Sequence, residues 1–179
     1  MQPQRILRYL AIGLRAWKAA ASMCRYNLLV DDFSRFSDKR NSLGMKASDD
    51  GSMRYLTVSE DTIFFAPQRL SYFYETVPCV SERASGYNAI AFTIKAPQDA
   101  SITLEMQTAD DCTSELYNST WRYVMNFTGE AQRVVAPMSS FQGARTNGIA
   151  AFNWATWETN TADFVWELGD IELICGAVP

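Results

Sequence analysis

The 179-residue sequence contains no histidine, and this absence removes several kinds of chemistry at once. Serine–histidine–aspartate catalysis, cysteine–histidine catalysis and histidine-ligated zinc sites all need an imidazole ring. The chain also lacks an apolar run near the roughly 20 residues that cross a bilayer. In contrast, 47% of its residues are hydrophobic and 13% are aromatic. This composition excludes a disordered chain and predicts one domain with a substantial core.

Charge is distributed unevenly along the chain. Residues 1–25 contain five basic residues and no acid, whereas the remainder contains 11 basic and 20 acidic residues, a net charge of −9. A body this acidic argues against nucleic-acid binding. Residues 5–21 have apolar side chains on one side of a helical wheel and basic ones on the other, which predicts an amphipathic helix. We therefore divide the chain into an N-terminal segment, residues 1–25, and a β-domain, residues 26–179.

The role of the N-terminal segment has several interpretations. It is a poor secretory signal, because its longest uncharged run is shorter than the roughly 7–15 residues of a signal-peptide core. Three interpretations follow from its pattern: a divergent signal, a retained helix docked on the body, and a helix that contacts a membrane surface. A start codon assigned too far upstream is a fourth explanation. We favour the docked helix.

From Leu28 onward, short strands separated by turn residues replace the helical pattern. About ten strands are expected, the last two at residues 164–167 and 170–175, with no second helix. The strands at residues 87–95 and 102–107 are central, since apolar side chains alternate in both and bury one face of each. Pro97 and Asp99 predict a turn between them, and therefore a hairpin. Strands at this spacing indicate an all-β jelly-roll β-sandwich.

Two of these strands carry polar side chains on the face opposite their apolar one. At residues 102–107 this face is formed by Thr103, Glu105 and Gln107. At residues 71–77 one face carries Tyr72, Tyr74 and Thr76, and the other carries Phe73, Glu75 and Val77. We expect the Thr-Glu-Gln face to line a concave pocket, in which Glu105 could give or take a proton. Simple surface exposure of the glutamates is the alternative.

Aromatic side chains are more numerous than a small core requires. Trp154 and Trp157 flank a loop with few other apolar residues. Loop tryptophans of this kind often stack on sugars or line an apolar ligand site. Trp166 alternates with other apolar residues and is expected in the core. The candidate ligand-binding residues are Trp121, Tyr123, Asn153, Trp154 and Trp157.

The four cysteines contain no CxxC motif and favour disulfides over zinc. In such a sandwich the first and last strands commonly pair antiparallel, which would bring Cys24 close to Cys175. The remaining pair is then Cys79 with Cys112. Four buried free thiols are the alternative.

Two further groups of residues suggest modification and metal binding. Glycosylation sequons begin at Asn118 and Asn126, and together with the cysteines they favour the secretory pathway or secretion. Aspartates occur in turns and at strand starts, where structural calcium is one interpretation and turn capping is the other. These aspartates are Asp31, Asp32, Asp49, Asp50 and Asp170.

Seven segments, in order along the chain, carry a resemblance to known proteins. They are LLVDDFS, NSLG, SDDGSM, SYFYETVPCV, YNAIAFTIKAP, ITLEMQTADDC and WELGDIELICG. The series resembles a family of small fungal secreted proteins with a galactose-binding-like jelly roll, from about Leu28 to Gly176. Residues 1–25 do not match, since family members usually begin with a cleavable signal peptide. One branch is similar to the hetero-Diels–Alderases of fungal tropolone sesquiterpenoid biosynthesis.

This resemblance implies a cofactor-independent cyclase that joins a tropolone quinone methide to a humulene-type alkene. The pocket would align the two apolar substrates, and a hydrogen bond to the developing oxygen would polarise the heterodiene. We expect the polar roles to fall to Glu105, Gln107, Tyr72 and Tyr74, with the tryptophans as apolar walls and a homodimer left open. The alternative function is a non-catalytic carbohydrate-binding module at a fungal cell wall. A third is an inert cell-surface structural protein.

Overall fold

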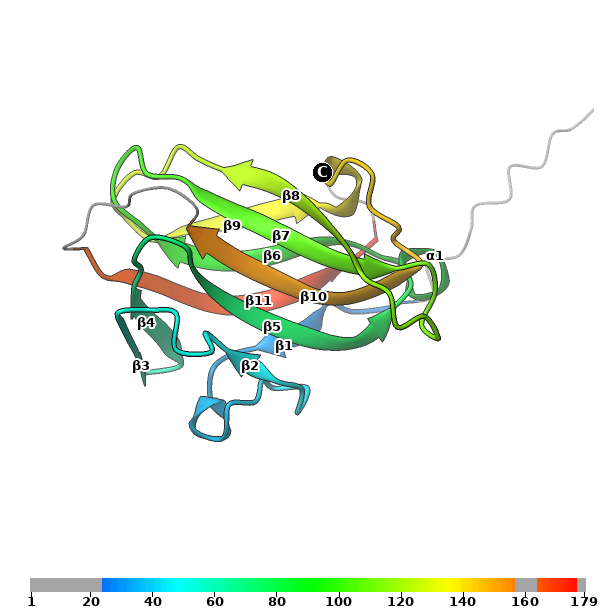
Figure 1. The fold of residues 1–179 in the computed structure, drawn as a ribbon, viewed down its shortest axis with the longest axis horizontal. Coiled ribbons are helices and arrows are strands. Elements are labelled where there is room, and N and C mark those ends of the chain that lie inside the picture. The colour runs from blue at the N-terminus through cyan, green and yellow to red at the C-terminus, as the bar shows by residue number, and fades with distance from the viewer. Residues whose placement is uncertain (1–23, 157–163, 177–179) are drawn as a thin grey trace, which may run out of the picture.

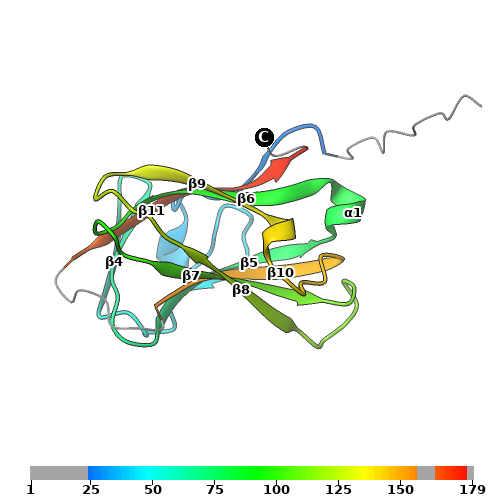
Figure 2. The ribbon, with the colours of Figure 1, turned by 90° about the horizontal axis from the view of Figure 1, so that it is seen from above.

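The computed structural model describes residues 24–156 and 164–176, which form two antiparallel β-sheets packed face to face (Figures 1 and 2). One sheet contains β1 (Leu28–Asp31), β3 (Tyr55–Ser59), β4 (Thr62–Ala66), β6 (Tyr87–Lys95), β9 (Gln132–Pro137) and β11 (Trp166–Cys175). The other has the order β2 (Ala47–Ser48), β5 (Ser71–Val80), β10 (Gly148–Thr156), β7 (Ile102–Ala109) and β8 (Asn118–Val124). The predicted all-β sandwich is confirmed.

Helical structure in the described residues is limited to single turns. These are α1 (Glu82–Ser85) and the 3-10 turns η1 (Phe36–Asp38) and η2 (Met138–Ser140). The sequence pattern missed α1, because one turn is too short to show a helical period. The predicted helix at residues 5–21 lies outside the described residues. No helix in the described part is long and apolar enough to span a membrane.

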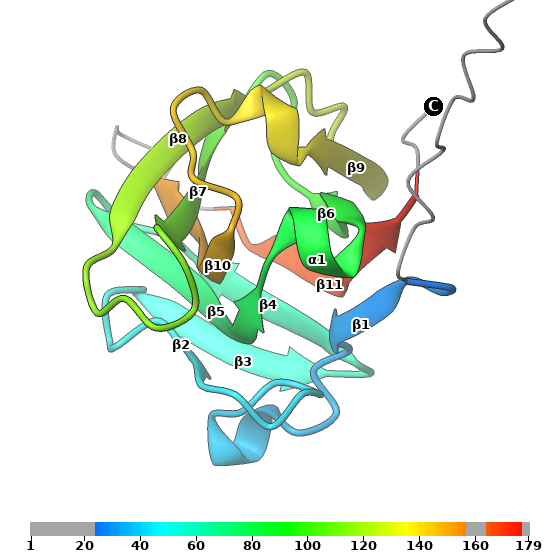
Figure 3. The same cartoon turned by 90° about the vertical axis from the view of Figure 1, so that its right-hand side faces the viewer.

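The central strands β6 and β7 do not form the predicted hairpin. Strand β6 pairs with β9 and β11 in the six-stranded sheet, whereas β7 pairs with β8 and β10 in the five-stranded sheet. The connection at residues 96–101 therefore carries the chain from one layer to the other, as the end-on view in Figure 3 shows. Side chains nevertheless alternate between the inner and outer faces along both strands, as expected, because each sheet turns only one face toward the core.

The two C-terminal strands predicted at residues 164–167 and 170–175 are one strand, β11. Its register shifts between Gly169 and Glu172, where Asp170 adopts a positive φ of 47°. The first part of β11 pairs with β4 and the second part pairs with β1 along the same edge. A kink of this kind has the sequence signature of a turn, which explains the incorrect division.

Both predicted disulfides are confirmed. Antiparallel pairing of β1 with β11 brings Cys24 to Cys175. The second bond joins Cys79, near the end of β5, to Cys112 in the connection between β7 and β8. Disulfides are typical of an extracellular or secretory environment.

Aromatic residues from both sheets fill the space between the layers. The ring of Trp154 lies 6.2 Å from that of Phe73 in its own sheet and 5.3 Å from that of Phe92 in the opposite sheet. Trp166 is also fully buried and contacts Phe65. The expectation that Trp166 belongs to the core is confirmed, and the assignment of Trp154 to a ligand-binding loop is wrong. Trp154 instead lies in β10 and points inward, with 0% of its surface exposed.

Candidate functional site

The outer face of the five-stranded sheet carries three rows of side chains across β5, β10, β7 and β8. The strand register defines them. The first row is Tyr72, Ala155, Thr103 and Tyr123; the second is Tyr74, Asn153, Glu105 and Trp121; the third is Thr76, Ala151, Gln107 and Ser119. Because alternate residues point to opposite faces, all of them lie on the side away from the core. The predicted polar faces of the strands at 71–77 and 102–107 therefore share one surface.

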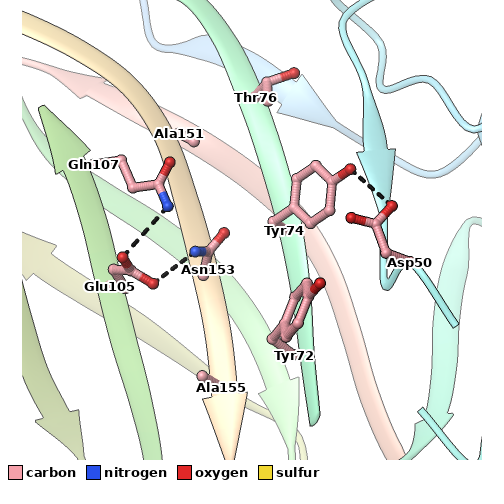
Figure 4. A pocket seen from close by; sticks show the side chains of 9 residues that line it. All are labelled: Asp50, Tyr72, Tyr74, Thr76, Glu105, Gln107, Ala151, Asn153 and Ala155. Carbon is pink, nitrogen blue, oxygen red and sulfur yellow. Dashed lines mark hydrogen bonds between the residues drawn. The ribbon is translucent and has the colours of Figure 1, made fainter. Parts of the chain in front are cut away.

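A pocket of about 350 Å³ lies over β5, β10 and β7 on this surface (Figure 4). Its wall contains all four side chains to which polar roles are assigned from the sequence, together with Asn153. Three further side chains of the strands and one from a neighbouring turn complete it. The full lining is Asp50, Tyr72, Tyr74, Thr76, Glu105, Gln107, Ala151, Asn153 and Ala155.

Glu105 lines the β7 side of the pocket and is held by two side-chain amides. Nδ2 of Asn153 donates to one carboxylate oxygen at 2.6 Å, and Nε2 of Gln107 donates to the other at 3.4 Å. Only 7% of the Glu105 surface is exposed, so its carboxylate depends on these donors in place of much of its water. The alternative that Glu105 is an ordinary surface glutamate is therefore wrong.

A second polar group forms the β5 wall. Partial burial raises the pKa of the Tyr74 phenol, which stays protonated and donates a hydrogen bond to Oδ1 of Asp50 at 3.1 Å. Lys46 lies 3.1 Å from the same oxygen and 5.1 Å from the centre of the Tyr74 ring. Partial burial acts to raise the pKa of Asp50, but the hydrogen bonds from Lys46 and Tyr74 outweigh it and lower that pKa. Contacts with Tyr74 and then Asp50 raise the pKa of Lys46.

The turn before β3 positions Asp50 at the pocket. Asp50 and Gly51 both adopt positive φ, 48° and 78°, and the backbone N–H of Asp50 donates to Oγ of Ser48. Ser52 then fastens the turn to β5, because its hydroxyl both donates to the carbonyl of Tyr72 and accepts from its N–H. Sequence reasoning identified the turn and missed its place in the pocket. The missing signal was the pairing of β2 with β5, which is long-range.

The other candidate ligand-binding residues lie outside the pocket, in different parts of the structure, or outside the described residues. Trp121 and Tyr123 share the outer face, on the edge strand β8, and are 53% and 67% exposed, but they do not line the pocket. Trp154 cannot reach it, since its ring is in the core. Trp157 lies outside the described residues. Asn118 and Asn126 of the two sequons are both exposed.

The five aspartates considered for calcium do not converge on one point. Asp32 accepts hydrogen bonds from Ser34 and Ser42, and Asp49 accepts one from the backbone N–H of Met53, as turn-capping residues do. Within residues 24–156 and 164–176, no group of three or more acidic or cysteine side chains is arranged to hold a metal ion.

On the core side of β5, directly behind the pocket wall, Glu75 meets Asp31 of β1 between the sheets. Both are fully buried. Asn41 donates to Oε2 of Glu75 at 2.9 Å, and the N–H of Phe33 donates to Oδ1 of Asp31 at 2.8 Å. The remaining oxygens, Oδ2 of Asp31 and Oε1 of Glu75, are buried without another hydrogen-bond partner, and one proton between the two carboxyl groups would satisfy both. Burial, followed by the charge of Asp31, raises the pKa of Glu75 well above its ordinary value, so Glu75 carries that proton.

Comparison with known proteins relates the fold to carbohydrate-binding modules. No protein-family model matches the chain, and no curated protein matches it in sequence. The family 11 carbohydrate-binding module from Clostridium thermocellum, in complex with a β-1,3-1,4-mixed-linked tetrasaccharide, matches with a TM-score of 0.57 and 12% identity. The match covers 86% of this chain and 98% of that one.

Two further solved structures are similar. The family 11 module of a cellulosomal cellulase of Clostridium thermocellum has a TM-score of 0.57 and 13% identity, over 87% of this chain and 98% of that one. A variant of the family 29 module CBM29-2, complexed with mannohexaose, has a TM-score of 0.52 and 10% identity, over 85% and 92% of the two chains. At these identities the likeness establishes the antiparallel β-sandwich alone.

Proposed function

We propose that this protein is a non-catalytic carbohydrate-binding module whose binding site is the pocket over β5, β10 and β7. The observation that carries the proposal is the chemistry of the pocket wall. Seven of its nine residues have polar side-chain atoms, and two of these seven are tyrosines. Sugars present hydroxyl groups at the ring edge and C–H groups on the ring faces. Polar groups beside aromatic rings suit both.

Each group in the pocket has a defined part in this proposal. The Tyr72 and Tyr74 rings, 6.1 Å apart and inclined by 34°, form a platform for the face of a sugar ring. The carboxylate of Glu105 and the amides of Asn153 and Gln107 bind hydroxyl groups. Support also comes from the fold, since two of the similar modules are complexes with oligosaccharides. A fungal cell-wall glycan is the ligand class of the alternative function that we considered from the sequence.

Calorimetric titration with oligosaccharides of β-glucan, mannan and chitin tests the proposal. We expect at least one to bind, and replacement of Tyr74 by alanine to weaken it roughly tenfold through loss of a stacking contact. Tyr55 is a matched control, because it is 50% exposed on β3 of the other sheet. Replacing it by alanine should leave affinity unchanged. If none of these sugars binds, the proposal is wrong.

The hetero-Diels–Alder cyclase implied by the resemblance is a second candidate. The observation that favours it is a largely buried carboxyl group, Glu105, in the same pocket as the Tyr72 and Tyr74 phenols, and this pocket is large enough for a small ligand. Ala151 and Ala155 are the only lining residues with wholly apolar side chains, so seven of the nine residues around a bound terpenoid would carry a polar side-chain atom, which weighs against this candidate. Incubation with a humulenol and a tropolone quinone-methide precursor decides the matter. Cyclisation no faster or more selective than the background would remove this candidate.

A further inference from the structure

The negative charge of Glu105 is not balanced by any cation of the described residues. Asp50, the other acid of the pocket, has its counter-ion in Lys46. Glu105 takes part in none of the four ion pairs that the described residues form, and its hydrogen-bond partners are the uncharged amides of Asn153 and Gln107. Amides solvate a carboxylate without neutralising it, so withdrawing Glu105 from water is costly while it stays unpaired.

The nearest basic residue on β8 does not correct this imbalance. Arg122 follows Trp121 in the chain and is paired with Leu104, an inward-facing residue of β7. Its guanidinium donates to Oγ of Ser140 at 2.7 Å. Arg122 is therefore engaged on the opposite side of the sheet from Glu105.

An exposed tryptophan, Trp121, is the cross-strand neighbour of Glu105. Trp121 is directly opposite Glu105 in the β7–β8 pair, where facing Cβ atoms are about 5 Å apart, and more than half of its surface is open. A carboxylate with an exposed tryptophan as its cross-strand neighbour is a favourable setting for an organic ammonium group, which gains a charge pair and, over the indole ring, a cation–π contact.

The opposite wall of the pocket already contains such an arrangement, complete with its cation. There the ammonium group of Lys46 lies 3.1 Å from Asp50 and 5.1 Å from the centre of the Tyr74 ring. Tyr74 and Trp121 stand at the two ends of one row, with Asn153 and Glu105 between them. At one end of the row Tyr74 lies next to Asp50, which has the Lys46 ammonium group as its partner. At the other end Trp121 is opposite Glu105, which has no ammonium partner among the described residues.

We infer that the ligand supplies the missing ammonium group, and that the pocket binds an amino-sugar oligosaccharide. The glucosamine units of deacetylated chitin have the required chemistry: a ring that stacks, hydroxyl groups that hydrogen-bond and a primary ammonium group for Glu105 and Trp121. Uronic acids and sulfated sugars would be repelled by the same carboxylate. This inference rests on the proposed function and specifies its ligand.

Three hexasaccharides test the inference, because they share a β-1,4-linked backbone and differ at one ring substituent. They are the glucosamine, N-acetylglucosamine and glucose oligomers. We expect calorimetry on the wild-type protein to give roughly tenfold tighter binding of the glucosamine oligomer, the size of one charge-assisted hydrogen bond. The preference should shrink as salt is added, since the site is open to solvent at Trp121.

Variants separate this inference from the function on which it rests. In Glu105→Gln the ratio of affinities for the glucosamine and glucose oligomers should fall close to one, whereas Glu167→Gln, on the other sheet, should keep the wild-type ratio. Equal wild-type affinities, or a preference that persists in Glu105→Gln, would overturn the inference and leave the carbohydrate-binding function standing. Failure of all three hexasaccharides to bind would overturn the inference, and the carbohydrate-binding function would fall with it only if the β-glucan and mannan oligosaccharides also fail to bind.

Discussion

The Glu75→Gln variant should become more stable than the wild type as the pH rises, even though Glu75 is fully buried and hydrogen-bonded. The folded protein holds a proton on Glu75, because burial and the Asp31 charge raise the pKa of this carboxyl well above its ordinary 4.5. The unfolded chain releases that proton above about pH 4.5. Rising pH therefore favours the unfolded state, until the pH passes the raised pKa of the folded state.

The size of this effect follows from proton linkage. One proton retained only by the folded state lowers the free energy of unfolding by about 1.4 kcal/mol for each pH unit. Glutamine keeps the shape of Glu75, donates an N–H to Asp31 and accepts from Asn41, but it does not ionise. The stability difference between Glu75→Gln and the wild type should thus be small near pH 4.5. It should then grow by about 1.4 kcal/mol for each pH unit, until the pH reaches the raised pKa of Glu75 in the folded protein.

Urea unfolding between pH 4 and pH 8 measures this difference, with the fluorescence of the buried Trp154 and Trp166 as the signal. Asp31 adds its own pH dependence, since burial also raises its pKa, but it is present in both proteins. A stability difference that stays constant across this range would refute the shared proton. Glu75→Ala is the contrasting variant: it leaves Asp31 charged and unpaired in the core and should cost about 3–5 kcal/mol.

Three other outcomes test separate parts of the structure. Trp154→Ala should lower the free energy of unfolding by about 3–5 kcal/mol, measured in urea, and leave the affinity for sugars unchanged because the ring lies in the core; a large loss of affinity with normal stability would contradict the core assignment. Replacing both Cys79 and Cys112 by serine should cost about 2–4 kcal/mol, and unchanged stability would show that the bond does not restrict the unfolded chain. When the protein is secreted from a eukaryotic host, Asn118→Gln and Asn126→Gln should each remove the mass of one glycan in intact-mass spectrometry, and a wild-type mass equal to that of the bare chain would rule out both sites.

The sequence alone predicts which side chains of a strand share a face better than it predicts which strands pair with one another. Glu105 was assigned to an outer face correctly, and Tyr72 and Tyr74 to one shared face, because a period of two needs only the neighbouring residues. The sheet assignment of β6 and β7 failed, since a short polar connection suits a hairpin and a crossing between layers equally well. Pairing of the first and last strands was the one long-range assumption that gave a correct result, the Cys24–Cys175 bond.

The parts of the site that escaped prediction depend on residues distant in sequence. Asp50 reaches the pocket because β2 pairs with β5, and Glu75 tolerates burial because Asp31 and Asn41 surround it. Trp154 was misplaced because the turn-like residues after it suggested a loop, whereas β10 continues to Thr156. In each case the deciding contact comes from another strand or loop.

The Cys24–Cys175 bond has a mechanical consequence for a protein held through its two ends. It encloses residues 25–174, so tension applied outside the two cysteines passes through the sulfur atoms and bypasses the sandwich. Stretching in an atomic force microscope should then release no length from the strands until a reductant is added. A domain tethered this way would withstand drag while the pocket over β5, β10 and β7 keeps its shape.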